Sequence, residues 1–135
     1  MKKIILSVAI ATTALMADIS VVVNPNSGVD SLTQSQVKKI FMGKTKQFPN
    51  GSAVRPVDQN SGSTYKEFYK KIAGKSPSKM NKYWVKLTFT GKAEAPKKVG
   101  SNSSVIDAVK ENTKTIGYID SSAVTNDVKV VYTVK

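Results

Sequence analysis

Residues 54–72 read VRPVDQNSGSTYKEFYKKI, and this stretch decides the expected fold. A short strand is expected from Ala53, just before this stretch, to Asp58, and Asn60 to Thr64 form a small polar turn. An amphipathic helix follows and ends at Gly74. Its apolar side chains recur at helical spacing, at Tyr65, Phe68, Tyr69 and Ile72. The stretch therefore predicts a strand, a tight turn and a helix that packs back on the strand.

The turn suits an anion, because the first N–H groups of a helix lack partners within it and the helix dipole adds positive charge there. The residues expected to bind are Asn60, Ser61, Gly62, Ser63 and Thr64, with Arg55 lending charge from the preceding strand. A purely structural interpretation stays open beside this one. In it, Thr64 and Glu67 form a capping box, Gly62 only supplies a positive φ, and Arg55 is a solvated edge residue.

The rest of the chain continues the alternation of strands and helices. A helix from Leu32 to Met42 has Thr33 and Gln36 as a capping box, and Ser76 with Pro77 opens another. Residues 90–100 are expected to form a loop, and Ser104 with Asp107 to cap a further helix. Further strands are expected at Asp18–Val23, Thr115–Ile119 and Val128–Val134. This order predicts one α/β domain whose sheet order stays open.

The N-terminus has the pattern of a secretory signal peptide. Lys2 and Lys3 precede an apolar run from Ile4 to Leu15, and small residues up to Ala17 offer a cleavage site. Residues 1–17 are therefore expected to be removed, leaving residues 18–135 as a periplasmic domain. The chain has no cysteine, which excludes both disulfides and a lipid-modified cysteine at the cleavage site.

The composition also bounds the chemistry. The chain has neither histidine nor cysteine, and its 9 acidic residues are scattered, so no cofactor, metal site or catalytic centre is expected. Serines and lysines are too numerous for one Ser–Lys pair to stand out. The net charge of +12 could attract nucleic acid, but the lysines do not cluster on one periodic face. We expect no nucleic-acid partner, and a positive field that draws in small anions.

Several fragments, in order, resemble a known family. They are Phe41–Lys44, Val57–Gln59, Gly62–Ser63, Glu67–Tyr69, Gly74–Ser76, Tyr83–Trp84, Phe89–Lys92 and Ile116–Ile119. Together they resemble small exported bacterial proteins named phosphate ABC transporter substrate-binding proteins. The resemblance implies a single lobe like one domain of a type II periplasmic binding protein. It also implies that Ser61, Gly62 and Ser63 match the family's Ser-Gly-Thr phosphate turn.

Two functions follow as expectations. The first is non-catalytic binding of phosphate or a similar oxyanion in support of uptake through an ABC permease, with two chains closing on one anion as a possible homodimer. The second is a single-lobe interaction module that has lost its small ligand and docks to a membrane or envelope partner through its basic surface.

Overall fold

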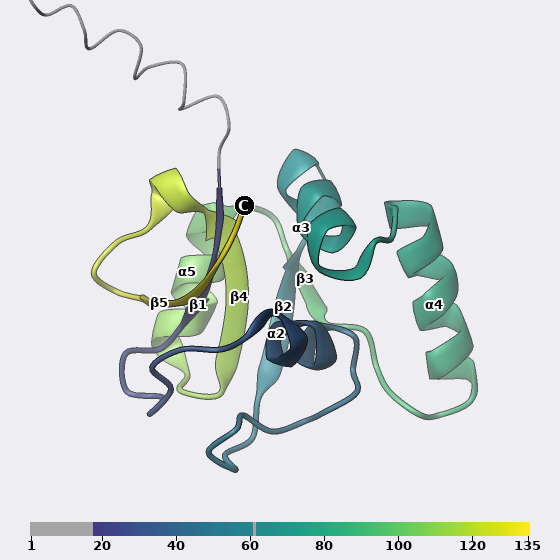
Figure 1. Cartoon of the computed structure of the whole chain (residues 1–135), viewed down its shortest axis with the longest axis horizontal. Coiled ribbons are helices and arrows are strands. Elements are labelled where there is room, and N and C mark those ends of the chain that lie inside the picture. Colours follow the sequence, from purple (N-terminus) through teal and green to yellow (C-terminus); the bar gives the residue numbers. More distant parts are fainter. Residues whose placement is uncertain (1–17, 61) are drawn as a thin grey trace, which may run out of the picture.

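A computed structural model describes residues 18–60 and 62–135, which fold around a five-stranded sheet of order β3-β2-β4-β1-β5 (Figure 1). The strands are β1 (Ile19–Val23), β2 (Arg55–Gln59), β3 (Lys97–Val99), β4 (Thr115–Asp120) and β5 (Lys129–Val134). The helices are α2 (Gln34–Phe41), α3 (Ser63–Ala73), α4 (Pro77–Phe89) and α5 (Asn102–Glu111), with a 3₁₀ turn, η2 (Ser121–Ala123). β2 runs parallel to β3 and β4, whereas β1 is antiparallel to both β4 and β5.

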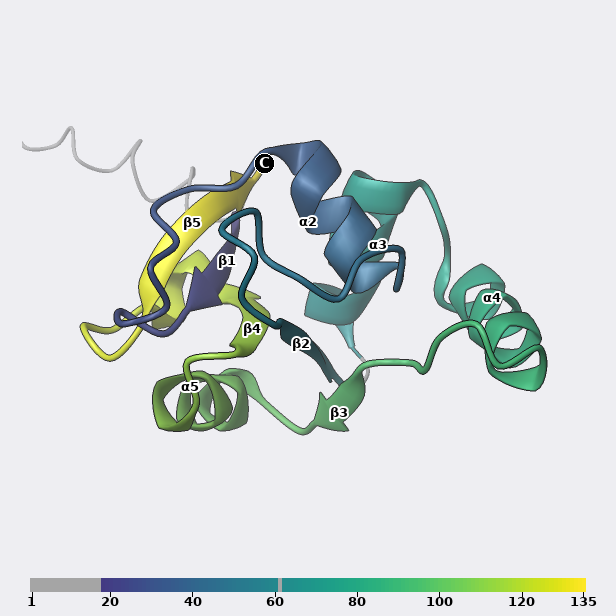
Figure 2. The same cartoon turned by 90° about the horizontal axis from the view of Figure 1, so that it is seen from below.

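Helices cover both faces of the sheet, so the α/β prediction is confirmed. In Figure 2, α2 and α3 lie on one side of the strands and α5 on the other. Along β1, Val21 and Val23 belong to the larger core under α2, α3 and α4, while Val22 belongs to the smaller core under α5. This alternation is the two-residue period of a strand buried on both faces.

Most of the predicted helix signals are confirmed. Thr33 and Gln36 form the complete capping box of α2, and Ser76 caps α4 with Pro77 at its first turn. α3 ends at Gly74 in the left-handed conformation, with φ 66°. All four residues of the predicted apolar face of α3 are buried. The aromatic residues of α3 therefore pack in the core, where Phe68 stacks on Tyr118 with ring centroids 3.8 Å apart.

Two local predictions are wrong. The expected loop over residues 90–100 contains β3, which adds a parallel edge strand beside β2. The cap of α5 is Ser101 rather than Ser104, because the Ser101 hydroxyl accepts the Ser104 N–H at 3.1 Å and the helix begins at Asn102.

The signal peptide expected at residues 1–17 lies outside the described residues. Among residues 18–60 and 62–135, none of the helices combines the length and apolar character needed to cross a bilayer.

Gly117, in the middle of β4, lets α5 approach the sheet closely. A Cβ atom built there would lie 2.5 Å from Cγ1 of Val105 and 3.0 Å from Cγ2 of Val57. The distance to Val105 is too short for a real carbon contact and the distance to Val57 is tight, so a larger side chain would push α5 away from β4. This close packing brings the start of α5 beside the carboxyl ends of β2 and β4.

Candidate functional site

The predicted anion-binding turn lies between the carboxyl end of β2 and the start of α3. Gly62 is the N-cap of α3, with φ 94° and no side-chain hydrogen bond to the helix start. An L side chain rarely adopts this φ, so the glycine is required by the backbone. Gly62 and Ser63 are exposed, whereas Ser61 lies outside the described residues. The chain is thus exposed at Gly62 and Ser63, where α3 begins, whereas Thr64 and Tyr65 behind them are buried.

A polar network joins this turn to the start of α5. Thr64 donates its hydroxyl to Oδ1 of Asp120 at 2.9 Å, and Asn102 donates its amide to Oδ2 at 3.0 Å. Gln59 in turn donates to Oδ1 of Asn102 at 2.7 Å. The starts of α3 and α5 therefore meet at one carboxylate, placed at the carboxyl end of β4. Ligands of open α/β sheets bind at this kind of edge.

The alternative interpretation, in which Thr64 and Glu67 form a capping box, is wrong. Thr64 is the second residue of α3, not its cap, and its hydroxyl is turned to Asp120. The sequence predicted that the Thr64 hydroxyl would bind a ligand. In the structure this hydroxyl donates to the carboxylate of Asp120 instead.

A buried carboxyl group lies two residues before the turn, near the end of β2. Asp58 is 1% exposed, and its Oδ1 accepts the hydroxyls of Tyr69 at 2.7 Å and Tyr118 at 3.1 Å. Burial raises the pKa of Asp58 to about 7, although the two hydroxyls and the charge of Lys98 oppose the shift. Burial, followed by the charge of Asp58, also raises the pKa of both tyrosines, so they stay neutral donors.

Lys98 supplies a positive charge beside the turn that the sequence did not predict. Lys98 pairs with Asp58 in the register of β3 and β2, and its Nζ lies 5.1 Å from the ring centroid of Tyr65. Tyr65 belongs to the first turn of α3, so the ammonium group lies over a side chain of that turn. The sequence missed Lys98 because residues 90–100 read as a loop, and a loop does not define which lysine faces the turn.

Arg55 lies away from the turn. It is exposed at the first position of β2, and the turn follows the last position, Gln59. At the rise of a strand, about 3.3 Å per residue, the two ends of β2 are roughly 13 Å apart. The structure therefore brings together Asn60, Gly62, Ser63 and Thr64, with Arg55 at the opposite end of the strand.

The sequence also did not predict three further residues of this network, namely Asp120, Asn102 and Gln59. A signal was available for Asp120, which follows the predicted strand Thr115–Ile119 directly. Recognising it required the knowledge that β4 is the parallel neighbour of β2, since only then do both carboxyl ends meet at one edge. The sequence left that strand order open.

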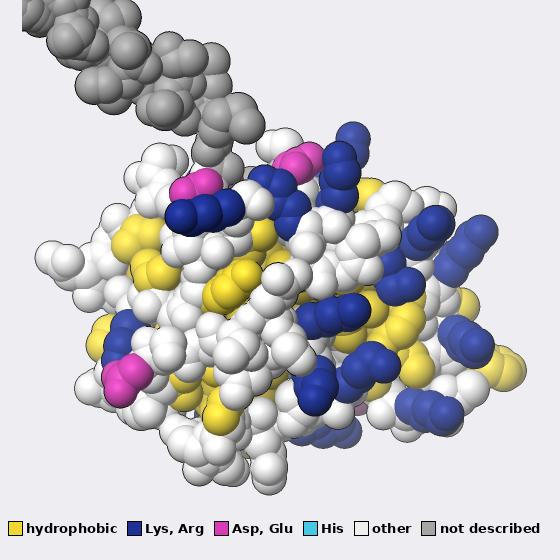
Figure 3. All heavy atoms as spheres, viewed as in Figure 1, with side chains coloured by type: hydrophobic (Ala, Val, Ile, Leu, Met, Phe, Trp, Pro, Cys, Tyr) yellow, Lys and Arg dark blue, Asp and Glu magenta, His cyan; other side chains and the backbone are white. Residues whose placement is uncertain are grey.

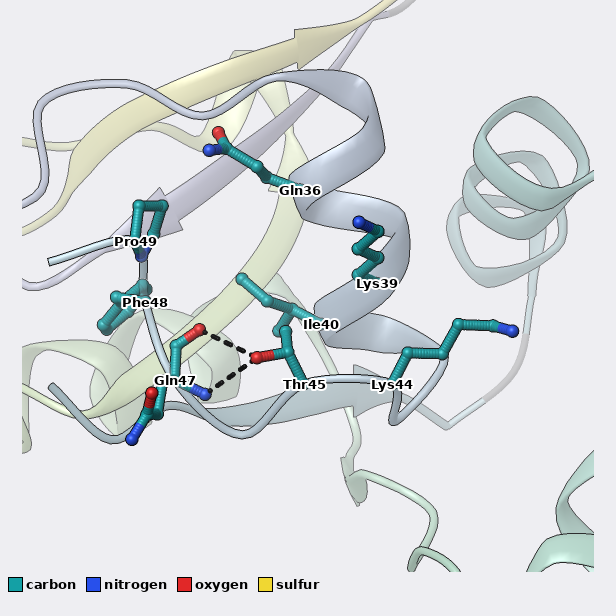
Figure 4. Close-up of a pocket in the computed structure, with 8 residues that line it drawn as sticks. All are labelled: Gln36, Lys39, Ile40, Lys44, Thr45, Gln47, Phe48 and Pro49. Carbon is teal, nitrogen blue, oxygen red and sulfur yellow. Dashed lines mark hydrogen bonds between the residues drawn. The ribbon is translucent and has the colours of Figure 1, made fainter. Parts of the chain in front are cut away.

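A pocket of about 400 Å³ lies elsewhere, between α2 and the segment that follows it (Figure 4). Its lining includes Ile40, Phe48, Lys39 and Lys44, and Thr45 bonds with the backbone of Gln47 beside it. In Figure 4 the Lys44 side chain extends away from the other lining residues. Its lining includes none of Asn60, Gly62, Ser63 or Thr64, so this pocket is separate from the turn. Within residues 18–60 and 62–135, no three acidic side chains gather as a metal site would require.

No protein-family profile and no curated protein matches this sequence. Solved structures do match it. A protein of Clostridium perfringens, assigned as a phosphate ABC transporter substrate-binding protein and solved with bound phosphate, superposes with a TM-score of 0.67 at 21% identity. An ABC-type phosphate transport receptor of Vibrio cholerae gives the same values, and PstS of Borrelia burgdorferi gives 0.63 at 16%.

Each match covers 85% of this chain but only 44%, 45% and 46% of the respective neighbour. The chain thus spans less than half the length of these proteins. At such identities the likeness concerns the fold, and it agrees with the layers and the mixed sheet described above. This chain therefore has a mixed α/β fold similar to a single lobe of these substrate-binding proteins.

Proposed function

We propose that this protein binds phosphate or a similar small oxyanion reversibly at the turn Asn60–Thr64, without catalysis, and serves uptake through an ABC permease from the periplasm. The observation that carries the proposal is the start of α3, which is exposed at Gly62 and Ser63 and lies at the carboxyl ends of the parallel strands β2 and β4. The likeness to the Clostridium perfringens protein, solved with bound phosphate, supports the same ligand class.

The chemistry around the turn fits an oxyanion. Backbone N–H groups at the start of α3 and the hydroxyl of Ser63 are donors, and Lys98 adds a nearby positive charge. The net charge of +12 adds a long-range attraction for anions. In Figure 3, most dark-blue side chains on this face lie on the side that carries α3 and α4.

Asp120 gives a reason for preferring phosphate to sulfate. Its carboxylate, held by Thr64 and Asn102, lies at the helix start and would repel an anion without a proton. Phosphate carries a proton at neutral pH and can donate it in a hydrogen bond to the carboxylate, whereas sulfate cannot. Asp120→Asn should therefore narrow the difference between the affinities for the two anions, and an unchanged ratio would remove Asp120 from this role.

A thermal titration tests the proposal. Protein purified without phosphate is heated with increasing phosphate, sulfate or citrate at fixed ionic strength. Phosphate at 100 times its Kd should stabilise the protein by about 2.7 kcal/mol, with a matching rise in Tm. An unchanged Tm at millimolar phosphate would contradict the proposal.

Two sets of variants locate the site. Ser61→Ala combined with Ser63→Ala should weaken phosphate binding and leave the fold intact. Lys98→Ala should raise the Kd a few-fold, by about 1 kcal/mol or less for one exposed charge. Lys97→Ala is the matched control, because it removes the same charge from the adjacent position of β3. If the parent and all these variants bind phosphate with the same affinity, the site lies elsewhere.

A further inference from the structure

α4 combines a buried face with an unusual outer face. Met80 and Trp84 are buried against the rest of the protein, and Tyr83 donates its hydroxyl to the carbonyl of Met42 at 2.6 Å. The helix lies at the periphery of the molecule, beyond α3 and away from the sheet (Figures 1 and 2). Its inner side is therefore anchored, and its outer side is free to meet another surface.

Two large apolar side chains project from the outer side. Val85 is 61% exposed and Phe89 is 91% exposed. Because they are four residues apart, they lie one above the other on the same face of the helix. Single exposed apolar residues are common on proteins, so their meaning depends on the charges around them.

The surroundings of this pair are basic, so lysines gather on one face of α4 although the sequence predicted no such clustering. Between Lys75 and Ala93 the chain has five lysines and no acidic residue; the lysines are Lys75, Lys79, Lys82, Lys86 and Lys92. Neither of the two salt bridges found in the described part of the chain involves α4. An exposed Glu94 comes only after this stretch. We define the α4 outer face as Val85, Phe89, Lys82 and Lys86.

We propose that the α4 outer face docks the protein on an anionic phospholipid surface, with Phe89 and Val85 inserted at the headgroup boundary and the lysines against lipid phosphates. Charge complementarity favours this occupant, since lysines held near an anionic membrane each add to binding. A folded protein partner usually requires about 800 Å² of each surface with an apolar centre. Two apolar side chains offer little of that, whereas interfacial insertion requires no matching surface.

This inference does not depend on the anion site. The α4 outer face lies on a different helix from the turn Asn60–Thr64, so docking and phosphate binding can succeed or fail separately. The described strands and helices all lie between Ile19 and Val134, so the chain starting at Asp18 serves for the test and avoids the apolar N-terminal run.

The test measures sedimentation with vesicles of phosphatidylcholine, with and without phosphatidylglycerol. We expect binding only when phosphatidylglycerol is present, and weaker binding at high salt. Phe89→Ser with Val85→Ser keeps the net charge and should weaken binding about tenfold or more. Lys82→Gln with Lys86→Gln should weaken it about 30-fold, from two lysines at the surface.

The matched control is Lys110→Gln with Lys114→Gln, which removes the same charge near α5, on the other side of the sheet. Circular dichroism and thermal unfolding check that each variant is folded. The proposal is overturned if the control loses as much affinity as the Lys82 and Lys86 variant, or if the Phe89 and Val85 variant binds like the parent. Absence of vesicle binding, together with crosslinking from α4 to a specific envelope protein, would also overturn it.

Discussion

At the scale of single residues, Asp58 links the interior to the candidate site. Its carboxyl group is buried, accepts two tyrosine hydroxyls and lies two residues before the turn. Its pKa is about 7 in the folded protein and 3.8 in its ordinary environment. Between these values the folded state binds more protons than the unfolded state, so this group makes stability fall as pH rises.

Asp58→Asn should remove this pH dependence. The shift corresponds to about 4 kcal/mol at the standard value per pKa unit, present as a penalty above pH 7 and absent below pH 4. The variant should therefore be more stable than the parent at pH 8, and the two should converge near pH 4, since the asparagine oxygen can still accept both tyrosine hydroxyls. Urea unfolding of both proteins from pH 4 to 8 measures the difference. A difference that stays constant with pH would contradict the assigned titration.

At the scale of elements, α3 and β3 show what the sequence could and could not predict. The apolar residues of α3 recur at helical spacing over two turns, and the preceding polar turn and Gly74 set its ends, so local information was sufficient. β3 has only Lys97, Lys98 and Val99, two of them exposed lysines, and follows Pro96. Its strand character comes from pairing with β2, a tertiary contact that local propensity does not encode.

A glycine in β4 provides the prediction at this scale. Gly117→Ala should destabilise the protein by about 1–3 kcal/mol, because the new methyl group would overlap Val105 of α5 and force the helix away from the sheet. The measurement is the free energy of unfolding in urea. Gly100→Ala is the matched control, since a Cβ atom there meets nothing within 4 Å and should change stability by about 0.5 kcal/mol or less. Equal effects of the two variants would refute the close-packing explanation.

At the scale of the whole molecule, the single-lobe α/β fold was predictable from the alternation of elements and the ordered fragments. The network of Asp120, Asn102, Gln59 and Thr64 was not. Its members come from β2, α3, α5 and β4, with Thr64 and Asp120 separated by 56 positions. Only the strand order, with β4 between β2 and β1, brings them together. Hydrogen-bond partners of that kind follow from topology rather than from local sequence.

The candidate site offers one exposed helix start, so it matters how this domain alone would hold an anion. An oxyanion at a single helix start keeps much of its surface in water, so each charged hydrogen bond competes with solvent and the net gain is small. A second copy facing the first would add another set of N–H groups and exclude that water. It would also bring two strongly basic chains together, and the bound anion would offset part of their repulsion.

We therefore expect phosphate to promote a homodimer. Light scattering after gel filtration should show the mass in solution rising towards twice the monomer as phosphate is added, with no rise in chloride at the same ionic strength. Calorimetry should find one phosphate for two chains. The Ser61→Ala and Ser63→Ala double variant should stay monomeric, because it lacks the donors around the shared anion. Binding of one phosphate by each monomer would contradict the dimer but not anion binding. A dimer that forms equally in chloride would show that association does not depend on phosphate.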